Sequence, residues 1–137
     1  TEITCNCTYY ILDEDWQERE FLPIGKAFPN RKVFLLDENN NEITGTQNVG
    51  EICVSGASVS LGYYNNKEQT EQAFIQNPLN NEYREIIYKT GDMAQYDSDG
   101  NLCFRGRKDF QIKYMGHRIE KDINALSRLI TRKIVSG

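Results

Sequence analysis

The residues best suited to bind a ligand gather between positions 88 and 120, in the run YKTGDMAQYDSDGNLCFRGRKDFQIKYMGHRIE. Asp92 could accept hydrogen bonds from the two hydroxyl groups of a ribose, because an ionised carboxylate offers two acceptor oxygens. Arg107 and Lys113 could bind phosphate oxygens through their positive charge. A lone Gly-Asp pair more often marks a turn or a helix cap, so the role of Asp92 depends on the residues around it.

Short strands joined by turns are predicted to position these side chains, because β-forming residues recur in short runs bounded by turn residues. The segment 12–30 is polar and rich in turn residues and is predicted to be a loop, whereas 97–101 predicts a hairpin turn. Asn66 is predicted to cap a helix over 67–74, and apolar residues at helical spacing predict a second helix over 122–136. The predicted strands are 3–11, 33–36, 50–56, 88–90, 93–96, 102–105 and 110–114.

The composition is that of a globular protein. The 137 residues are 39% hydrophobic and 26% charged, which is too apolar for a disordered chain and enough for one domain or a piece of a larger one. The net charge of -4 argues against binding to nucleic acid or to an anionic membrane surface. No apolar run reaches bilayer length and no signal peptide opens the chain, so a cytoplasmic location is expected.

The cysteines and the single histidine predict no metal site. Cys5 and Cys7 are two residues apart, whereas a zinc site usually takes a C-x2-C pair together with a second pair of ligands. Free thiols in a reducing compartment are therefore favoured for these two and for Cys53 and Cys103. No nucleophile pattern accompanies His117, so a packing or surface role is expected for it.

Four motifs, in order along the chain, resemble those of the acyl-adenylate-forming enzymes. This family includes the amino-acid adenylation domains of nonribosomal peptide synthetases, the D-alanine carrier-protein ligases and the acyl-CoA synthetases. Residues 1–4 resemble the end of its YGPTE motif, and 50–74 resemble its GELxVxG and GYxxxxxxT…F stretch, which supplies turns and core bulk. Residues 88–92 resemble its TGD segment, and 106–120 resemble its GRxDxQxKxxGxRIE segment.

The resemblance implies a role for each matching position. Asp92 and Arg107 would contact the ribose of ATP, and Arg107 would also reach the α-phosphate side. Thr1 would lie by the phosphates, and Glu2 would coordinate Mg2+. Asp109, with Lys108 beside it, would be the hinge about which a small C-terminal domain swings. Lys113, as a second ATP contact, and Arg118 also match the last motif, although a solvated strand face explains these two nearly as well. Gly116 would let the backbone approach the pantetheine arm.

The implied fold is mainly β with short helices (α+β). Residues 1–108 would form the distorted β-barrel-like subdomain that ends the large adenylation domain, and 109–137 would form the hinge and the beginning of the small C-terminal domain. The implied activity is that of an ATP-dependent ligase, which activates a carboxylate as acyl-AMP and transfers it to a phosphopantetheine thiol of a carrier protein, or to CoA. Residues 1–4 and 23–26 favour the branch that activates amino acids.

Parts of the family pattern are missing from the chain. It contains no TSGTTGxPK-type phosphate loop and no catalytic lysine of the far C-terminal domain, so the chain alone is expected to be inactive and to self-associate through uncovered apolar surface. The family continues LGEIE after 118–120, whereas this chain continues with Lys121-Asp122-Ile123-Asn124. The alternatives are an acyl-CoA synthetase-type ligase fragment, a β-rich interaction module without chemistry, and a zinc or redox module using Cys5 and Cys7.

Overall fold

The computed structural model describes residues 1–12, 21, 23–108, 111–114 and 117–120. The chain divides into two compact units, Thr1–Gly106 and Arg107–Gly137. The predicted boundary between residues 108 and 109 stays a prediction.

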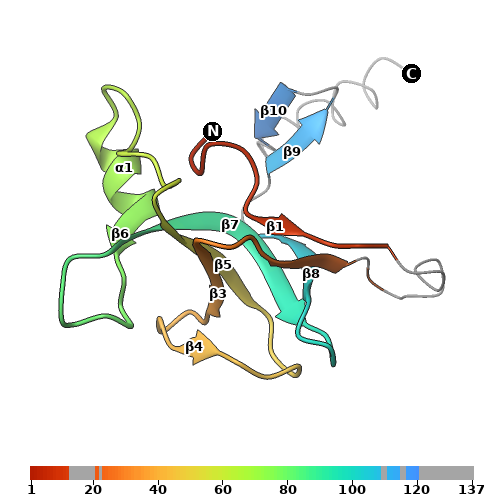
Figure 1. Cartoon of the computed structure of the whole chain (residues 1–137). Coiled ribbons are helices and arrows are strands. Elements are labelled where there is room, and N and C mark those ends of the chain that lie inside the picture. Colours follow the sequence, from red (N-terminus) through yellow and green to blue (C-terminus); the bar gives the residue numbers. More distant parts are fainter. Residues whose placement is uncertain (13–20, 22, 109–110, 115–116, 121–137) are drawn as a thin grey trace, which may run out of the picture. The chain divides into compact units, whose positions relative to one another are not determined.

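In its described residues, the first unit is built almost entirely from one antiparallel sheet, with a single short helix (Figure 1). Along the sheet the hydrogen-bonded order is β1-β2-β8-β7-β5-β3-β4, and β6 pairs with β7 beside this path. The strands are β1 (Thr8–Tyr9), β2 (Pro23–Ala27), β3 (Arg31–Leu36), β4 (Glu42–Ile43), β5 (Gly50–Gly56), β6 (Phe74–Gln76), β7 (Ile86–Tyr96) and β8 (Leu102–Arg107), and the helix is α1 (Lys67–Ala73).

This architecture confirms the predicted class, which was mainly β with short helices. The sheet is open rather than closed into a barrel, because β1 and β4 stand at its two ends and do not pair with each other among the residues described. The second unit contains β9 (Gln111–Tyr114) and β10 (His117–Glu120), which pair antiparallel with Arg118 opposite Lys113. In the described part of the chain, no helix is long and apolar enough to span a bilayer.

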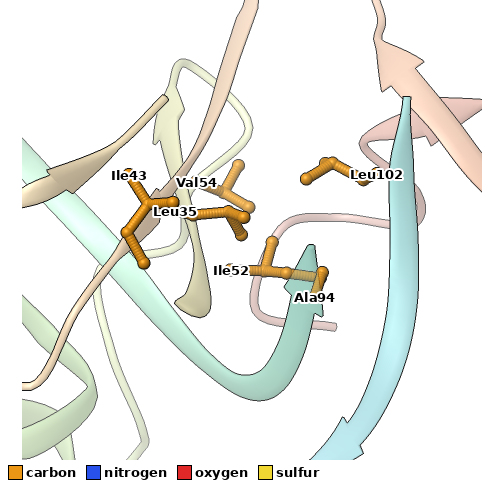
Figure 2. Packing of buried hydrophobic residues seen from close by; sticks show 6 residues of the cluster. All are labelled: Leu35, Ile43, Ile52, Val54, Ala94 and Leu102. Atoms are coloured by element: carbon orange, nitrogen blue, oxygen red, sulfur yellow. The ribbon is translucent and has the colours of Figure 1, made fainter. Parts of the chain in front are cut away.

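The middle of the sheet is buried on both faces, because neighbouring residues of a strand point to opposite sides. One buried cluster contains Leu35, Ile43, Ile52, Val54, Ala94 and Leu102 (Figure 2). The other contains Phe34, Leu36, Cys53 and Ile87. Burial of alternate residues in two different clusters explains the continuous apolar runs 34–36 in β3 and 52–54 in β5.

Several predicted elements are confirmed. The side chain of Asn66 accepts a hydrogen bond from the backbone N–H of Gln69 at 3.1 Å and so caps α1. At the predicted hairpin turn, Asp97 N–H donates to the carbonyl of Asn101 at 2.9 Å, and Gly100 adopts a φ of 74°. Strand β5 spans the predicted residues 50–56.

Other predictions were wrong in part. The predicted loop 12–30 contains β2. Its Gly25 has a φ of 84°, and a glycine at such a position is typical of a turn, so the strand was not predicted. Only Thr8–Tyr9 of the predicted strand 3–11 is a strand, since Thr4 has a φ of 75° and residues 2–5 turn. The two strands predicted at 88–90 and 93–96 are one, β7. The helix predicted over 122–136 lies outside the described residues.

Candidate functional site

Asp92 lies in a bulge of β7. Lys89 pairs with Cys53 and Met93 pairs with Glu51, so three residues of β7 (Thr90, Gly91 and Asp92) lie opposite a single residue of β5. Gly91 adopts a φ of 74°, a left-handed conformation that glycine reaches without strain. The gap predicted between the strands 88–90 and 93–96 is therefore a bulge inside one continuous strand.

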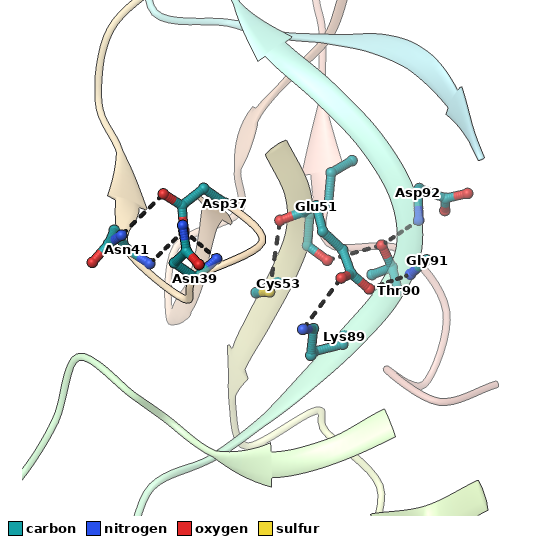
Figure 3. Close-up of polar contacts among 10 residues, drawn as sticks. Asp37, Asn39, Asn41, Glu51, Cys53, Lys89, Thr90, Gly91 and Asp92 are labelled. Atoms are coloured by element: carbon teal, nitrogen blue, oxygen red, sulfur yellow. Dashed lines mark hydrogen bonds and ion pairs between the residues drawn. The ribbon is translucent and has the colours of Figure 1, made fainter. Parts of the chain in front are cut away.

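Side chains fix the backbone of this bulge. The Thr90 hydroxyl donates to the carbonyl of Ile52 at 2.8 Å and accepts from the N–H of Asp92 at 3.0 Å. The N–H of Gly91 donates to Oε1 of Glu51 at 3.0 Å, and Oε2 of Glu51 lies 3.4 Å from Nζ of Lys89. In Figure 3 the Asp92 carboxylate points away from β5, on the opposite side of the β7 ribbon from the Glu51 side chain. The bulge therefore presents the Asp92 carboxylate away from the side chains of Thr90 and Glu51 that hold its backbone.

Glu2 is held by residues far along the chain. Its Oε1 accepts a hydrogen bond from the Tyr63 hydroxyl at 2.9 Å, and its backbone carbonyl accepts one from Ser60 N–H at 2.9 Å. The Tyr63 ring packs edge-on against Phe74, with ring centroids 5.5 Å apart, and Phe74 in turn packs against Tyr88 at 5.0 Å. These contacts limit the rotamers open to the Glu2 side chain, which is 17% exposed.

The segment that carries Thr1 and Glu2 folds against the sheet near the Asp92 bulge. Ile3 and Cys7 pack against the core cluster of Leu35. Burial raises the pKa of the Cys7 thiol, the guanidinium of Arg31 opposes this rise, and the carboxylate of Asp92 adds to it. Asp92 therefore lies close enough to Cys7 for its charge to act on the thiol.

Glu2 could hold a magnesium ion only if a bound nucleotide supplied other ligands to the same ion. Carboxylate oxygens suit Mg2+, which usually takes one or two of them and completes its shell with phosphate and water. Over the described ranges, no three His, Cys, Asp or Glu residues gather in a way that could hold a metal. Phosphate oxygens of a bound nucleotide would have to supply the remaining ligands.

The remaining predicted residues lie in or beside the second unit. Arg107 ends β8 and is partly buried, and the exposed Lys108 follows it. Lys113 lies in β9. Asp109 and Gly116 are outside the described residues. Asp92 belongs to the first unit and Arg107 to the second, and their convergence on one ribose stays a prediction.

Two residues in this site were not predicted from the sequence. Glu51 and Tyr63 belong to the stretch that was interpreted as purely structural, yet Glu51 holds the bulge and Tyr63 holds Glu2. Their partners are 40 and 61 residues away, and no local pattern encodes such contacts. The signal available was the glutamate of the Gly-Glu-Ile run, because a charged residue in a fully buried strand needs a partner.

The sequence comparisons place these residues among known proteins. Residues 1–64 match the family of AMP-binding enzymes. Over 120 residues the chain is 41% identical to bacitracin synthase 1 of Bacillus licheniformis, a match that covers 88% of this chain and 2% of that protein. It is 39% identical over 120 residues to surfactin synthase subunit 3 of Bacillus subtilis (strain 168), covering 88% of this chain and 9% of that protein. The chain therefore spans only a small part of the length of these relatives.

Solved structures give the same result for the fold. The structure of PA1221, a nonribosomal peptide synthetase (NRPS) protein containing adenylation and PCP domains, matches with a TM-score of 0.81 and 37% identity, over 96% of this chain and 26% of that one. NpsA-ThdA, an artificially fused adenylation-PCP di-domain NRPS from Klebsiella oxytoca, matches with a TM-score of 0.63 and 32% identity, over 72% of this chain and 18% of that one.

Proposed function

Because this chain belongs to the adenylate-forming family of AMP-binding enzymes, we propose that it is the late part of an amino-acid adenylation domain. The complete domain activates an amino acid with ATP. An oxygen of the amino-acid carboxylate attacks the α-phosphorus, the bond from that phosphorus to the bridging oxygen breaks, and pyrophosphate leaves. The aminoacyl-AMP formed then passes its acyl group to a phosphopantetheine thiol of a carrier protein, with release of AMP.

In this proposal Asp92 binds the ribose of ATP. The observation that carries it is the bulge of β7, which presents an outward carboxylate on a backbone held by Thr90 and Glu51. A carboxylate fixed in this way can accept hydrogen bonds from both ribose hydroxyls, and such charge-assisted bonds are stronger than neutral ones. Asp92 orients the nucleotide and does not touch the phosphorus that reacts.

Glu2 and Thr1 serve the phosphate end of the nucleotide. The carboxylate of Glu2, whose Oε1 accepts a hydrogen bond from the Tyr63 hydroxyl, would coordinate a magnesium ion together with the phosphates of ATP. When bound, such an ion would supply positive charge to the phosphates. Thr1 precedes Glu2 on the same segment and is exposed, as a residue that contacts phosphate must be.

The second unit supplies the remaining proposed roles. Arg107 binds the ribose and the α-phosphate side, and Lys113 provides further positive charge to the nucleotide. Lys108 and Asp109 form the hinge between residues 1–108 of the large domain and 109–137 of the small one, and Gly116 lets the backbone approach the pantetheine arm. The division of the chain after Gly106, two residues from this boundary, is compatible with the assignment.

The proposed acceptor is a carrier protein rather than free CoA. The relatives include bacitracin and surfactin synthases, and the matching structures of PA1221 and NpsA-ThdA contain a PCP domain beside the adenylation domain. These likenesses support the amino-acid branch over the acyl-CoA synthetase branch.

The direct test is exchange of labelled phosphate between pyrophosphate and ATP by the complete adenylation domain that contains this chain. We expect at least one amino acid to stimulate exchange. Asp92→Asn is expected to lower kcat/KM for ATP by about 10- to 100-fold, the effect of a lost hydrogen bond to a charged group. Asp99→Asn, an equal charge change in the exposed hairpin turn, is expected to have little effect. Failure of every amino acid to stimulate exchange would refute the proposal.

A further inference from the structure

Glu51 is a buried carboxylate in the middle of the sheet. It is 6% exposed, in a strand whose neighbouring residues are apolar and buried. A buried charge costs free energy unless hydrogen bonds and an opposite charge compensate it. Two of its partners are the N–H of Gly91 at 3.0 Å and the ammonium of Lys89 at 3.4 Å (Figure 3).

Both of these partners flank the Asp92 bulge. The described pairing of β5 with β7 shifts its register between Glu51 and Cys53, opposite the three bulged residues. A bulge takes backbone groups out of the regular ladder, and a side chain must then satisfy them. Here the Glu51 carboxylate accepts from Gly91, the residue next to Asp92, and anchors Lys89 on the other side of the bulge.

We infer that Glu51 is a positioning residue, which holds the β7 bulge in the conformation that presents the Asp92 carboxylate to a nucleotide ribose. This inference rests on the proposed function. Glu51 itself lies on the far side of the β7 ribbon from the Asp92 carboxylate and acts through the backbone of Gly91. Together with the bond from Thr90 to Ile52, it fixes the bulge at two points of β5.

A purely structural role would have a different consequence. If Glu51 only stabilised the sheet, its replacement would lower the stability of the domain and leave the nucleotide contacts of the folded molecules intact. If Glu51 positions Asp92, its replacement weakens only those nucleotide contacts that Asp92 makes. A ligand without ribose hydroxyls separates the two roles, because Asp92 has nothing to bind on it.

The experiment compares ATP with 2′,3′-dideoxy-ATP by calorimetric titration of the complete adenylation domain. The wild type is expected to bind ATP at least about tenfold more tightly than the dideoxy analogue. Glu51→Gln keeps the shape of the side chain but removes its charge. We expect it to lose most of this preference while its affinity for the dideoxy analogue stays unchanged. Glu38→Gln, the same substitution at an exposed turn position, is the matched control and keeps the full preference.

The outcomes separate the two proposals. If folded Glu51→Gln keeps the preference of the wild type, Glu51 does not position Asp92, and the proposed function stands. If the wild type itself binds neither nucleotide, both the proposed function and the proposed role of Glu51 are refuted. If Glu51→Gln does not fold, Glu51→Asp is used, because it keeps the charge but shortens the side chain by one methylene and so withdraws the acceptor oxygen from the N–H of Gly91. It is expected to lose part of the preference, and an unchanged preference would overturn the inference.

Discussion

Glu85 illustrates how neighbouring side chains fix the ionisation of a single residue. Its carboxylate accepts hydrogen bonds from the Ser55 hydroxyl, from Asn77 Nδ2 at 2.8 Å and from Asn80 Nδ2 at 2.9 Å. The bond from Ser55 is the largest cause, followed by those from Asn80 and Asn77, and together they lower the pKa of Glu85 from 4.5 to about 2. The carboxylate thereby ties the loop between β6 and β7 to strand β5.

This shift predicts a loss of stability in acid. In the unfolded chain Glu85 takes up a proton near pH 4.5, whereas in the folded protein it does so only near pH 2. Its contribution to the free energy of unfolding is therefore complete above about pH 4.5 and disappears as the pH falls to about 2. Urea unfolding at a series of pH values should show this decline in the wild type.

Glu85→Gln is expected to remove that part of the decline. At pH 7 it should cost about 1 kcal/mol, a modest value because the site is partly exposed to solvent. Glu82→Gln, a change of the same charge at an exposed position of the same loop, is the control. Equal acid sensitivity of wild type and Glu85→Gln would contradict the assigned network.

At the same scale, the sequence was more informative about the residues proposed to bind a ligand than about the residues that support them. Asp92 was predicted to lie between two strands, and the structure places it in a bulge of one strand. The supporting roles of Glu51 and Tyr63 were not predicted, because they arise only when segments distant in sequence come together. Local patterns report propensity and burial, while supporting hydrogen bonds depend on tertiary register.

Among the elements, those with strong local signals were predicted well. The Asn66 cap and the turn at 97–101 are satisfied within a few residues, so their sequences suffice. Strand β2 was missed because its pairing is decided by its neighbours. Pro23 pairs with Cys103 and Gly25 with Leu102, and Lys26 pairs with Tyr9. Proline and glycine are poor strand formers alone, but both occur at bulges, and this pairing shifts register between them.

Gly25 gives a test of this element. A Cβ added to it would lie 1.7 Å from the carbonyl oxygen of Tyr9, and its φ of 84° already disfavours side chains. Gly25→Ala is therefore expected to destabilise the protein by at least about 2 kcal/mol, because the β1 backbone must move. Gly45→Ala is the matched control, since a Cβ there meets nothing within 4 Å, and it should change stability by less than about 0.5 kcal/mol. Similar denaturation midpoints for the two variants would contradict the packing of β1 on β2.

For the molecule as a whole, the exposed apolar side chains are the main departure from an independent globular protein. Leu61 is 102% exposed and Tyr64 is 97% exposed, both in the segment between β5 and α1. Leu61 and Tyr64 are three positions apart, and exposed apolar patches mark surfaces that bind other protein segments. We expect the isolated 137-residue chain to self-associate through this segment.

Sedimentation velocity can check this expectation. The double variant Leu61→Ser/Tyr64→Ser should shift the isolated chain toward monomer over a range of concentrations. Tyr83→Ser, which removes a single exposed aromatic ring from another loop, should leave the distribution unchanged. A wild-type chain that stays monomeric throughout would rule out self-association.

The central claim is that the Asp92 carboxylate binds the ribose of ATP. The most direct measurement is a thermodynamic cycle, in which the affinities of the complete adenylation domain and its Asp92→Asn variant are determined for ATP and for 2′,3′-dideoxy-ATP. The predicted result is non-additivity. Asp92→Asn lowers the affinity for ATP by about 10- to 100-fold and leaves the affinity for the dideoxy analogue almost unchanged. Equal weakening of both nucleotides would contradict the account, because a contact with the ribose hydroxyls cannot be lost by a ligand that lacks them.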